Sequence, residues 1–140
     1  MSTLDSFFQG MRTSATGLSA ERIRMNTIAD NLAGANITRT PEGGPYQRKQ
    51  VMFEPLVSGD GQIHGVRAAR IVPDTRSEHV RIHEPGHEHA DANGYVTLPN
   101  VNSLKEMADM ITAMRAYEAN LTAQQSFARM ATRALELARP

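Results

Sequence analysis

The sequence has no cysteine and no tryptophan, only 5% of its residues are aromatic, and its formal net charge is zero. The lack of cysteine excludes a disulfide framework, a thiolate metal site and a thiol nucleophile. The balance of 15 basic and 15 acidic residues gives no bulk attraction to nucleic acid or to an acidic membrane surface. Leucine, isoleucine, alanine and eight methionines remain to build a core. We therefore expect one domain with a thin core.

Long hydrophobic runs are also missing. Nowhere do about 18 apolar residues follow one another. Residues 1–10 lack the basic start and the apolar run of a cleavable secretory signal. We expect no insertion into a membrane and no cleavable signal.

Proline and glycine are rare at both ends of the chain. Six of the seven prolines and seven of the ten glycines lie between Pro41 and Pro99. This distribution predicts an N-terminal axial helix in residues 1–36, a Gly/Pro-rich linker with a small β-rich insert in residues 37–99, and a C-terminal axial helix in residues 100–140. The expected fold class is mainly α with a small β-rich insert.

The middle segment has the composition of short strands joined by turns. Residues 46–54 and 66–72 carry β-branched or aromatic side chains between glycine and proline breakers. Asn93 and Gly94 precede another such stretch, and this pair favours a type I′ hairpin turn because both central residues of that turn need a positive φ. A sheet this small is expected to lean on the helices or on a neighbouring molecule.

Both predicted helices carry apolar residues at heptad spacing. The N-terminal seam is Leu4, Met11, Leu18, Met25 and Leu32, and the C-terminal seam is Met107, Met110, Met114, Tyr117, Leu121, Ala128 and Leu135. Two such stripes predict that the long helices form a coiled-coil pair. The second helix is expected to begin after Asn102, with Ser103 and Glu106 forming a capping box.

Helices of this length do not fit inside a small globule. At about 1.5 Å per residue they extend roughly 48 and 55 Å, whereas a compact chain of this size has a diameter of about 37 Å. We therefore expect an elongated molecule. Two interpretations remain open: an intramolecular helical hairpin with a β appendage, or an assembly in which the apolar stripes of many copies pack together.

Catalytic and metal-binding patterns are weak. Histidines and acids gather from His79 to Asp91, but Pro85 and Gly86 break any helix that would place His79, His83 and His87 on one face. We interpret this cluster as a solvated polar loop. No serine lies in a Gly-x-Ser-x-Gly elbow, no glycine-rich stretch has the lysine of a phosphate loop, and the arginines are scattered. We expect no enzyme activity, no cofactor, no metal and no nucleic-acid binding.

Two stretches resemble a known family. The first runs from Gly17 through Asn31-Leu32-Ala33-Gly34-Ala35-Asn36-Ile37-Thr38 to Gly44-Pro45-Tyr46-Gln47-Arg48, and the second runs from Pro85 through Pro99-Asn100-Val101-Asn102 to Ala116-Tyr117-Glu118-Ala119-Asn120. Both are similar to the flagellar axial protein family, whose members form the rod of the bacterial flagellar basal body. The residues that carry the motif here are Asn31, Ala33, Asn36, Thr38, Pro99, Asn100 and Asn120.

The resemblance implies a structural subunit that helps to transmit torque from the motor to the hook. It implies self-assembly through the terminal helices, together with the other rod proteins FlgB, FlgF and FlgG and the junction protein FliE. It also implies uncleaved export through the flagellar type III apparatus and a place in the rod that crosses the periplasm. The alternative is a helical-hairpin adaptor or chaperone-like module that binds another protein through the same stripes.

Local roles can be assigned to several of the matched residues. Gly34 suits the left-handed residue that follows a helix. Asn31, Asn36 and Thr38 are expected to bond backbone groups where that helix ends. Asn120, a polar residue beside an apolar stripe, is of the kind that fixes helix register.

Overall fold

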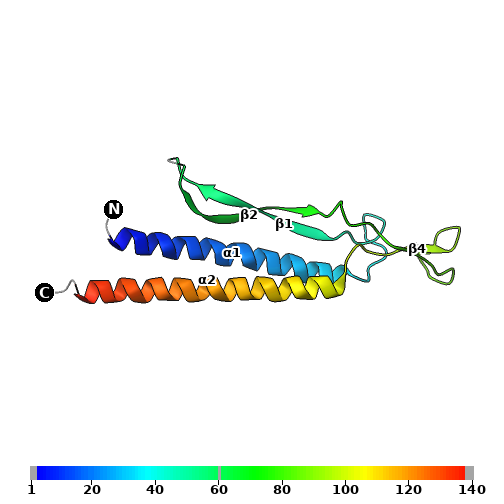
Figure 1. Ribbon diagram of the computed structural model, residues 1–140. Coiled ribbons are helices and arrows are strands. Elements are labelled where there is room, and N and C mark those ends of the chain that lie inside the picture. Colours follow the sequence, from blue (N-terminus) through cyan, green and yellow to red (C-terminus); the bar gives the residue numbers. More distant parts are fainter. Residues whose placement is uncertain (1–2, 60, 138–140) are drawn as a thin grey trace.

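The computed structural model describes residues 3–59 and 61–137. Helices α1 (Thr3–Gly34) and α2 (Ser103–Leu137) lie side by side and antiparallel, with both chain ends at one end of the molecule (Figure 1). A long two-stranded ribbon follows α1 on the side away from α2, and a small hairpin projects beyond the other end of the helices (Figure 1). The molecule is therefore long and narrow.

The ribbon consists of β1 (Lys49–Val57) and β2 (Ile63–Pro73), which pair antiparallel from Lys49↔Pro73 to Val57↔Ile63. The register shifts between Met52 and Phe53 and again between Leu56 and Val57. Such bulges increase the local twist of a ribbon. The two strands accordingly cross in projection (Figure 1).

The small hairpin consists of β3 (Arg81–His83) and β4 (Tyr95–Thr97). Gly94, immediately before β4, has a φ of 75°. Asn93 is not among the residues with positive φ, and the loop between the two strands runs from residue 84 to residue 94. The predicted two-residue type I′ turn is therefore wrong, although a turn does end at Gly94.

Both predicted helices are present, but their ends differ from the expected details. Asn102 caps α2, because its side-chain oxygen accepts a hydrogen bond from the N–H of Lys105 at 3.0 Å. Glu106 points into the molecule, so the predicted capping box is wrong. Gly34 is the last residue of α1 and is not among the glycines with positive φ. A Cβ at Gly34 would lie 2.5 Å from Tyr46 Cγ, so the position needs glycine because the tyrosine ring packs on it.

The core is small and partly polar. The buried apolar side chains of the described residues are Ala20, Ile28, Val96, Ala113 and Ala131. The largest side chains that are almost completely buried are Glu106, Val96 and Asn31. Hydrophobic burial alone therefore does not hold the helices and the ribbon together.

The predicted coiled-coil pair is wrong. The helices meet along a different row, the helix contact line, in which Gly10 faces Phe127, Gly17 faces Asn120 and Asn31 hydrogen-bonds Glu106. The residue numbers in each of these pairs (10 and 127, 17 and 120, 31 and 106) add up to 137, as a regular antiparallel register requires. Glycines let the helices approach closely, and amide and carboxylate groups fill positions that a coiled coil gives to apolar side chains.

Apart from Met110 and Tyr117, the predicted seam residues lie one residue further along each helix than the contact line. One residue turns a helix by about 100°, which moves the apolar row out of the helix interface. "Mainly α" was also wrong, because the 32 residues of α1 and the 35 residues of α2 make up only about half of the 140-residue chain. The ribbon is a second principal element that runs beside α1.

Candidate assembly surface and buried polar junction

A cluster of charged and amide side chains joins the helices to the ribbon. This polar junction is Asn31, Arg48, Asp74, Asn100 and Glu106. Glu106 is fully buried, and its Oε1 accepts a hydrogen bond from Arg48 Nε at 2.6 Å. The same guanidinium reaches Asp74 Oδ2 at 3.1 Å. Burial alone would lower the pKa of Arg48, but the hydrogen bonds and charges of the two carboxylates raise it above its ordinary value.

Asn31 links three segments and uses its full hydrogen-bonding capacity. Its Nδ2 donates to the carbonyl of Lys49 at 2.8 Å and to Glu106 Oε2 at 3.0 Å. Its Oδ1 accepts from the N–H of Lys49 at 2.8 Å and from the hydroxyl of Tyr46 at 3.1 Å. One amide thus joins the end of α1 to the start of β1 and to the first turn of α2.

Asn100 performs the corresponding role on the other side of Arg48. Its Oδ1 accepts from the N–H of Arg48 at 2.7 Å, and its Nδ2 donates to the carbonyls of Asp74 and Ser77 at 3.1 and 3.0 Å. In the described part of the chain no buried side-chain nitrogen or oxygen lacks a hydrogen-bond partner. The junction is therefore a satisfied network, which rigidifies the fold.

Asp74 is buried at the end of β2. The N–H of Arg76, which donates to Oδ1 at 2.9 Å, is the main cause that lowers the pKa of Asp74 to about 2. The hydroxyl and N–H of Ser77 and the guanidinium of Arg48 lower this pKa further, against the opposing effect of burial. Asp74 is therefore charged at every ordinary pH, and its charge is matched by Arg48.

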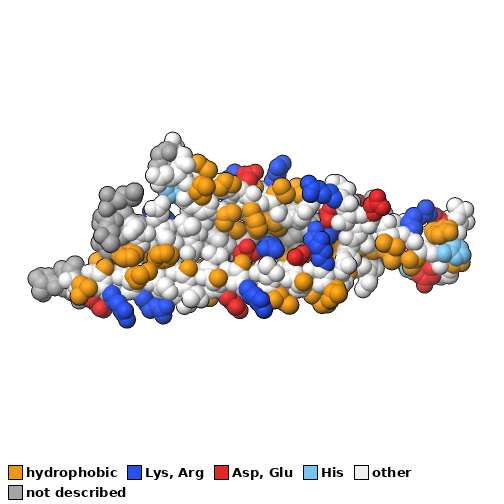
Figure 2. Space-filling model, in the orientation of Figure 1, with side chains coloured by type: hydrophobic (Ala, Val, Ile, Leu, Met, Phe, Trp, Pro, Cys, Tyr) orange, Lys and Arg blue, Asp and Glu red, His pale blue; other side chains and the backbone are white. Residues whose placement is uncertain are grey.

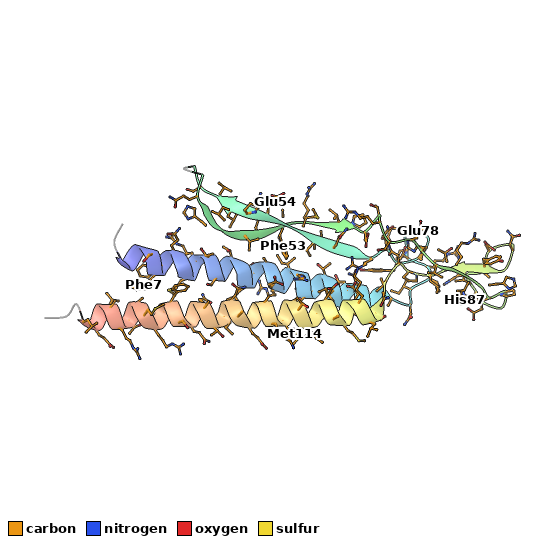
Figure 3. The ribbon with its side chains drawn as sticks, in the orientation of Figure 1. Phe7, Phe53, Glu54, Glu78, His87 and Met114 are labelled. Atoms are coloured by element: carbon orange, nitrogen blue, oxygen red, sulfur yellow. The ribbon has the colours of Figure 1, made fainter. Side chains whose placement is uncertain are left out.

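The apolar seams lie on the surface of the helix pair. In the C-terminal seam, Met107 is 53% exposed, Met114 47%, Leu121 38% and Leu135 54%. Figure 2 shows apolar side chains along α2, and Met114 points away from α1 in Figure 3. Leu104 and Ile111, 79% and 53% exposed, extend this stripe and were missed by the heptad pattern.

The remaining seam residues are partly covered. The structure places Met11, Leu18, Met25, Leu32, Met110, Tyr117 and Ala128 at intermediate exposure. Leu4 lies in α1, but its side chain is outside the described residues. The main row of each seam is displaced from the helix contact line by one residue toward the C-terminus, which is a rotation of about 100° around its helix. Because the two helices are antiparallel, these rotations bring both rows to the same side of the helix pair. Both seams therefore form one surface, which we call the helix-pair apolar face.

The ribbon lies on the side of α1 that is opposite to the helix-pair apolar face. It contacts α1 through Thr13 and Thr16, which are rotated from the helix contact line in the opposite sense to Met11 and Leu18. Shallow grooves between the helices open onto the helix-pair apolar face, one beside Met11 and Gln124 and another beside Leu18 and Tyr117. The ribbon leaves this face uncovered.

The seven motif residues do not form one site. Asn31 and Asn100 meet in the polar junction, whereas Asn120 lies on the helix contact line with its Nδ2 donating to the carbonyl of Ala116 at 2.9 Å. Thr38 Oγ1 lies 2.8 Å from His89 Nδ1, and Pro99 is buried. Ala33 and Asn36 are exposed.

Sequence reasoning missed the charged members of the junction as functional residues. Glu106 was assigned to a helix cap, Arg48 was only part of the motif, and Asp74 had no role. The one available signal was a glutamate in the first turn of a helix that follows Pro99 and Asn100. Pairing across 58 residues, as between Arg48 and Glu106, leaves no local pattern.

The histidine cluster lies in the loop and hairpin beyond the helices, where His87 is labelled in Figure 3. The rings of His87 and His89 are 5.5 Å apart. Within residues 3–59 and 61–137, no three histidine, aspartate or glutamate side chains are grouped to hold a metal ion. No helix of the described chain combines the length and hydropathy needed to cross a bilayer.

Comparison with known proteins identifies the family. Residues 11–39 match the model of the flagella basal body rod protein, and residues 92–137 match that of the flagellar basal body rod FlgEFG protein C-terminal region. The chain is 38% identical over 147 residues to the flagellar basal-body rod protein FlgC of Borreliella burgdorferi, covering 93% of this chain and 96% of that protein. FlgC of Bacillus subtilis is 36% identical (93% and 97% covered), and FlgC of Aquifex aeolicus is 42% identical (83% and 85% covered). The chain therefore belongs to the FlgC family of flagellar basal-body rod proteins.

Proposed function

We propose that this structural, non-enzymatic rod subunit assembles through the helix-pair apolar face. The observation that carries the proposal is the placement of both seams on one uncovered side of the helices. Contiguous apolar surface on a protein of this size favours association with another protein. The helices supply that surface, and the polar junction keeps their orientation to the ribbon fixed.

The partners that we propose are further copies of this chain, the rod proteins FlgB, FlgF and FlgG, and the junction protein FliE. The chain would be exported uncleaved by the flagellar type III apparatus and would lie in the rod where it crosses the periplasm. Family membership supports each of these assignments. The division into an axial helix at 1–36, an insert at 37–99 and a second axial helix at 100–140 is part of the proposal.

The test is Leu121→Asp. Leu121 is 38% exposed and lies off the helix contact line, so the charge leaves the monomer folded but blocks packing of the apolar face. We expect export to continue while rods and swimming are lost, as measured by electron microscopy of basal bodies and by motility in soft agar.

Ala119→Asp is the matched control, because Ala119 is exposed on nearly the opposite side of α2. This variant should assemble normally. Intact rods in exported Leu121→Asp would show that the helix-pair apolar face is not the assembly surface.

A further inference from the structure

A two-stranded ribbon has two open edges. Each edge presents backbone N–H and C=O groups that can pair with a strand of another molecule. In β1 and β2, with 9 and 11 residues, the edges are long enough for such pairing. A subunit that assembles through the proposed helix surface has to limit this contact.

Helix α1 occupies one part of the β2 edge. The N–H of Val66 donates to Thr16 Oγ1 at 3.1 Å, and Thr16 Oγ1 itself donates to the carbonyl of Thr13 at 2.7 Å. The hydroxyl of Thr13 lies 3.0 Å from the carbonyl of His64. A Cβ at Gly65 would collide with the Thr16 side chain, so glycine allows this close approach. Helix hydroxyls thus take the place of a neighbouring strand.

Asn31 covers part of the β1 edge, at the end of the ribbon where Lys49 pairs with Pro73. Its amide bonds both the N–H and the C=O of Lys49, each at 2.8 Å. This is the pair of bonds that a residue in an adjacent strand would make. The twist of the ribbon brings the β1 edge to α1 near Asn31 and the β2 edge to α1 near Thr16.

One proline on each strand interrupts the outer edge beyond the part that α1 covers. The backbone N–H and C=O of Lys49 point away from β2, toward Asn31. Every second residue of a strand has this orientation, so Pro55 also lies on the outer edge of β1. Pro73 pairs with Lys49 and therefore lies on the outer edge of β2. Both prolines are exposed and neither has an N–H to offer a new strand.

We propose that Thr13, Thr16, Asn31, Pro55 and Pro73 determine the specificity of assembly by preventing a second copy of this chain from adding its ribbon to this one. Each edge is blocked by α1 over one part and by a proline over another. Copies can then meet through side-chain surfaces such as the helix-pair apolar face, but not through strand addition. Strand addition is excluded whichever helix surface the copies use for assembly.

The test is the double variant Thr16→Val/Pro55→Val in the purified full-length chain. It removes the hydroxyl acceptor from the β2 edge and restores an N–H to the β1 edge. We expect β-rich oligomers by size-exclusion chromatography with light scattering, and at least a roughly tenfold rise in thioflavin T fluorescence, with helical circular dichroism retained.

Two controls make the result specific. Thr122→Val/Pro41→Val makes the same chemical changes at exposed positions outside the ribbon and should behave as the parent protein. Thr16→Ser/Pro55→Val returns the hydroxyl and should suppress most of the oligomers. A double variant that stays as monomeric as the parent, or one that aggregates only with loss of helix signal, overturns the proposal.

A single variant supplies a second readout. In Thr16→Val the amide of Val66 loses its acceptor, so its hydrogen exchange should accelerate roughly fivefold while distant amides of β1 are unchanged. Unchanged exchange at Val66 would mean that Thr16 does not cover the edge. Neither experiment involves Leu121, so failure here and failure of the helix-pair apolar face are distinguishable.

Discussion

Glu106 is a fully buried carboxylate and therefore needs hydrogen-bond and charge partners. A carboxylate with no exposed surface is stable only because Arg48 and Asn31 bond both of its oxygens. Removing its charge leaves the guanidinium with Asp74 and Asp109 as its carboxylate partners among the described residues. Glu106→Gln preserves the shape of the side chain, and we expect it to lower the free energy of unfolding by about 3 kcal/mol. Urea denaturation followed by circular dichroism measures this change.

Glu118→Gln is the control for this substitution. Glu118 lies in the same helix but is exposed, so its effect should stay within about 0.5 kcal/mol. Equal effects of the two substitutions would show that the junction does not depend on the buried charge.

Asp74 makes stability depend on acid pH. Its pKa in the folded protein, about 2, lies below the ordinary value of 3.8, so the folded state binds this proton less readily than the unfolded state. The contribution of Asp74 to stability is therefore complete above about pH 4 and is lost as the pH falls toward 2. Asp74→Asn should lose less stability between pH 5 and pH 3 than the parent does. The urea midpoints at these two pH values test this, and equal losses would assign the acid sensitivity to other groups.

At the scale of elements, the close packing of the antiparallel helices depends on Gly10 and Gly17. A Cβ at Gly17 would lie 2.7 Å from Asn120 Oδ1, which is closer than real contacts allow. Alanine gains about 1 kcal/mol in helix propensity, but overpacking of a fixed interface costs typically 1–3 kcal/mol. We expect Gly17→Ala to be destabilising by roughly 1 kcal/mol, measured by thermal unfolding.

A second substitution identifies the cause. Gly17→Ala/Asn120→Ala removes the collision and should recover the loss, whereas Gly86→Ala, where a Cβ would meet nothing within 4 Å, should be nearly neutral. If Asn120→Ala does not rescue Gly17→Ala, then close packing at this pair is not what requires glycine.

The helices and strands were largely predictable from the sequence, but the contact between the helices was not. Both helices and the strands near residues 49–57 and 63–73 followed from local composition, whereas the Asn-Gly pair did not form the predicted type I′ turn. Heptad spacing located the apolar stripes but not the row that makes contact, because glycine and amide side chains give no hydrophobic pattern. The true contact line has the same seven-residue spacing, shifted by one position.

The junction was predictable only in part for a related reason. Asn31 and Asn100 belong to the family motif, so the sequence could single them out. Their roles depend on Arg48, Asp74 and Glu106, which come together only when the ribbon folds back on the helices. Local sequence propensities cannot predict contacts between residues so far apart in the chain.

In the whole molecule, tightly packed side chains are concentrated toward one end. Asn31, Glu106 and Ala113 are at most 1% exposed and lie near the junction, whereas Ala131 is the main buried residue near the other end of α2. We expect the amides near Asn31 and Glu106 to exchange at least roughly tenfold more slowly than those in the first two turns of α1 and the last two turns of α2. Hydrogen exchange with mass spectrometry measures this gradient. Uniform protection along both helices would contradict it.

The position of the junction has a mechanical consequence. The helix pair is a lever about 48 Å long, held by the polar junction at one end and steadied by the contacts of Thr13 and Thr16 with β2, so that its free part is the end that carries both chain termini (Figure 1). In such a lever, a small change of angle near the held end becomes a larger displacement at the tip. The stiff network around Arg48 therefore governs how accurately the distant helix ends are aimed at their neighbours, while the thinly packed ends retain the compliance to adjust to them.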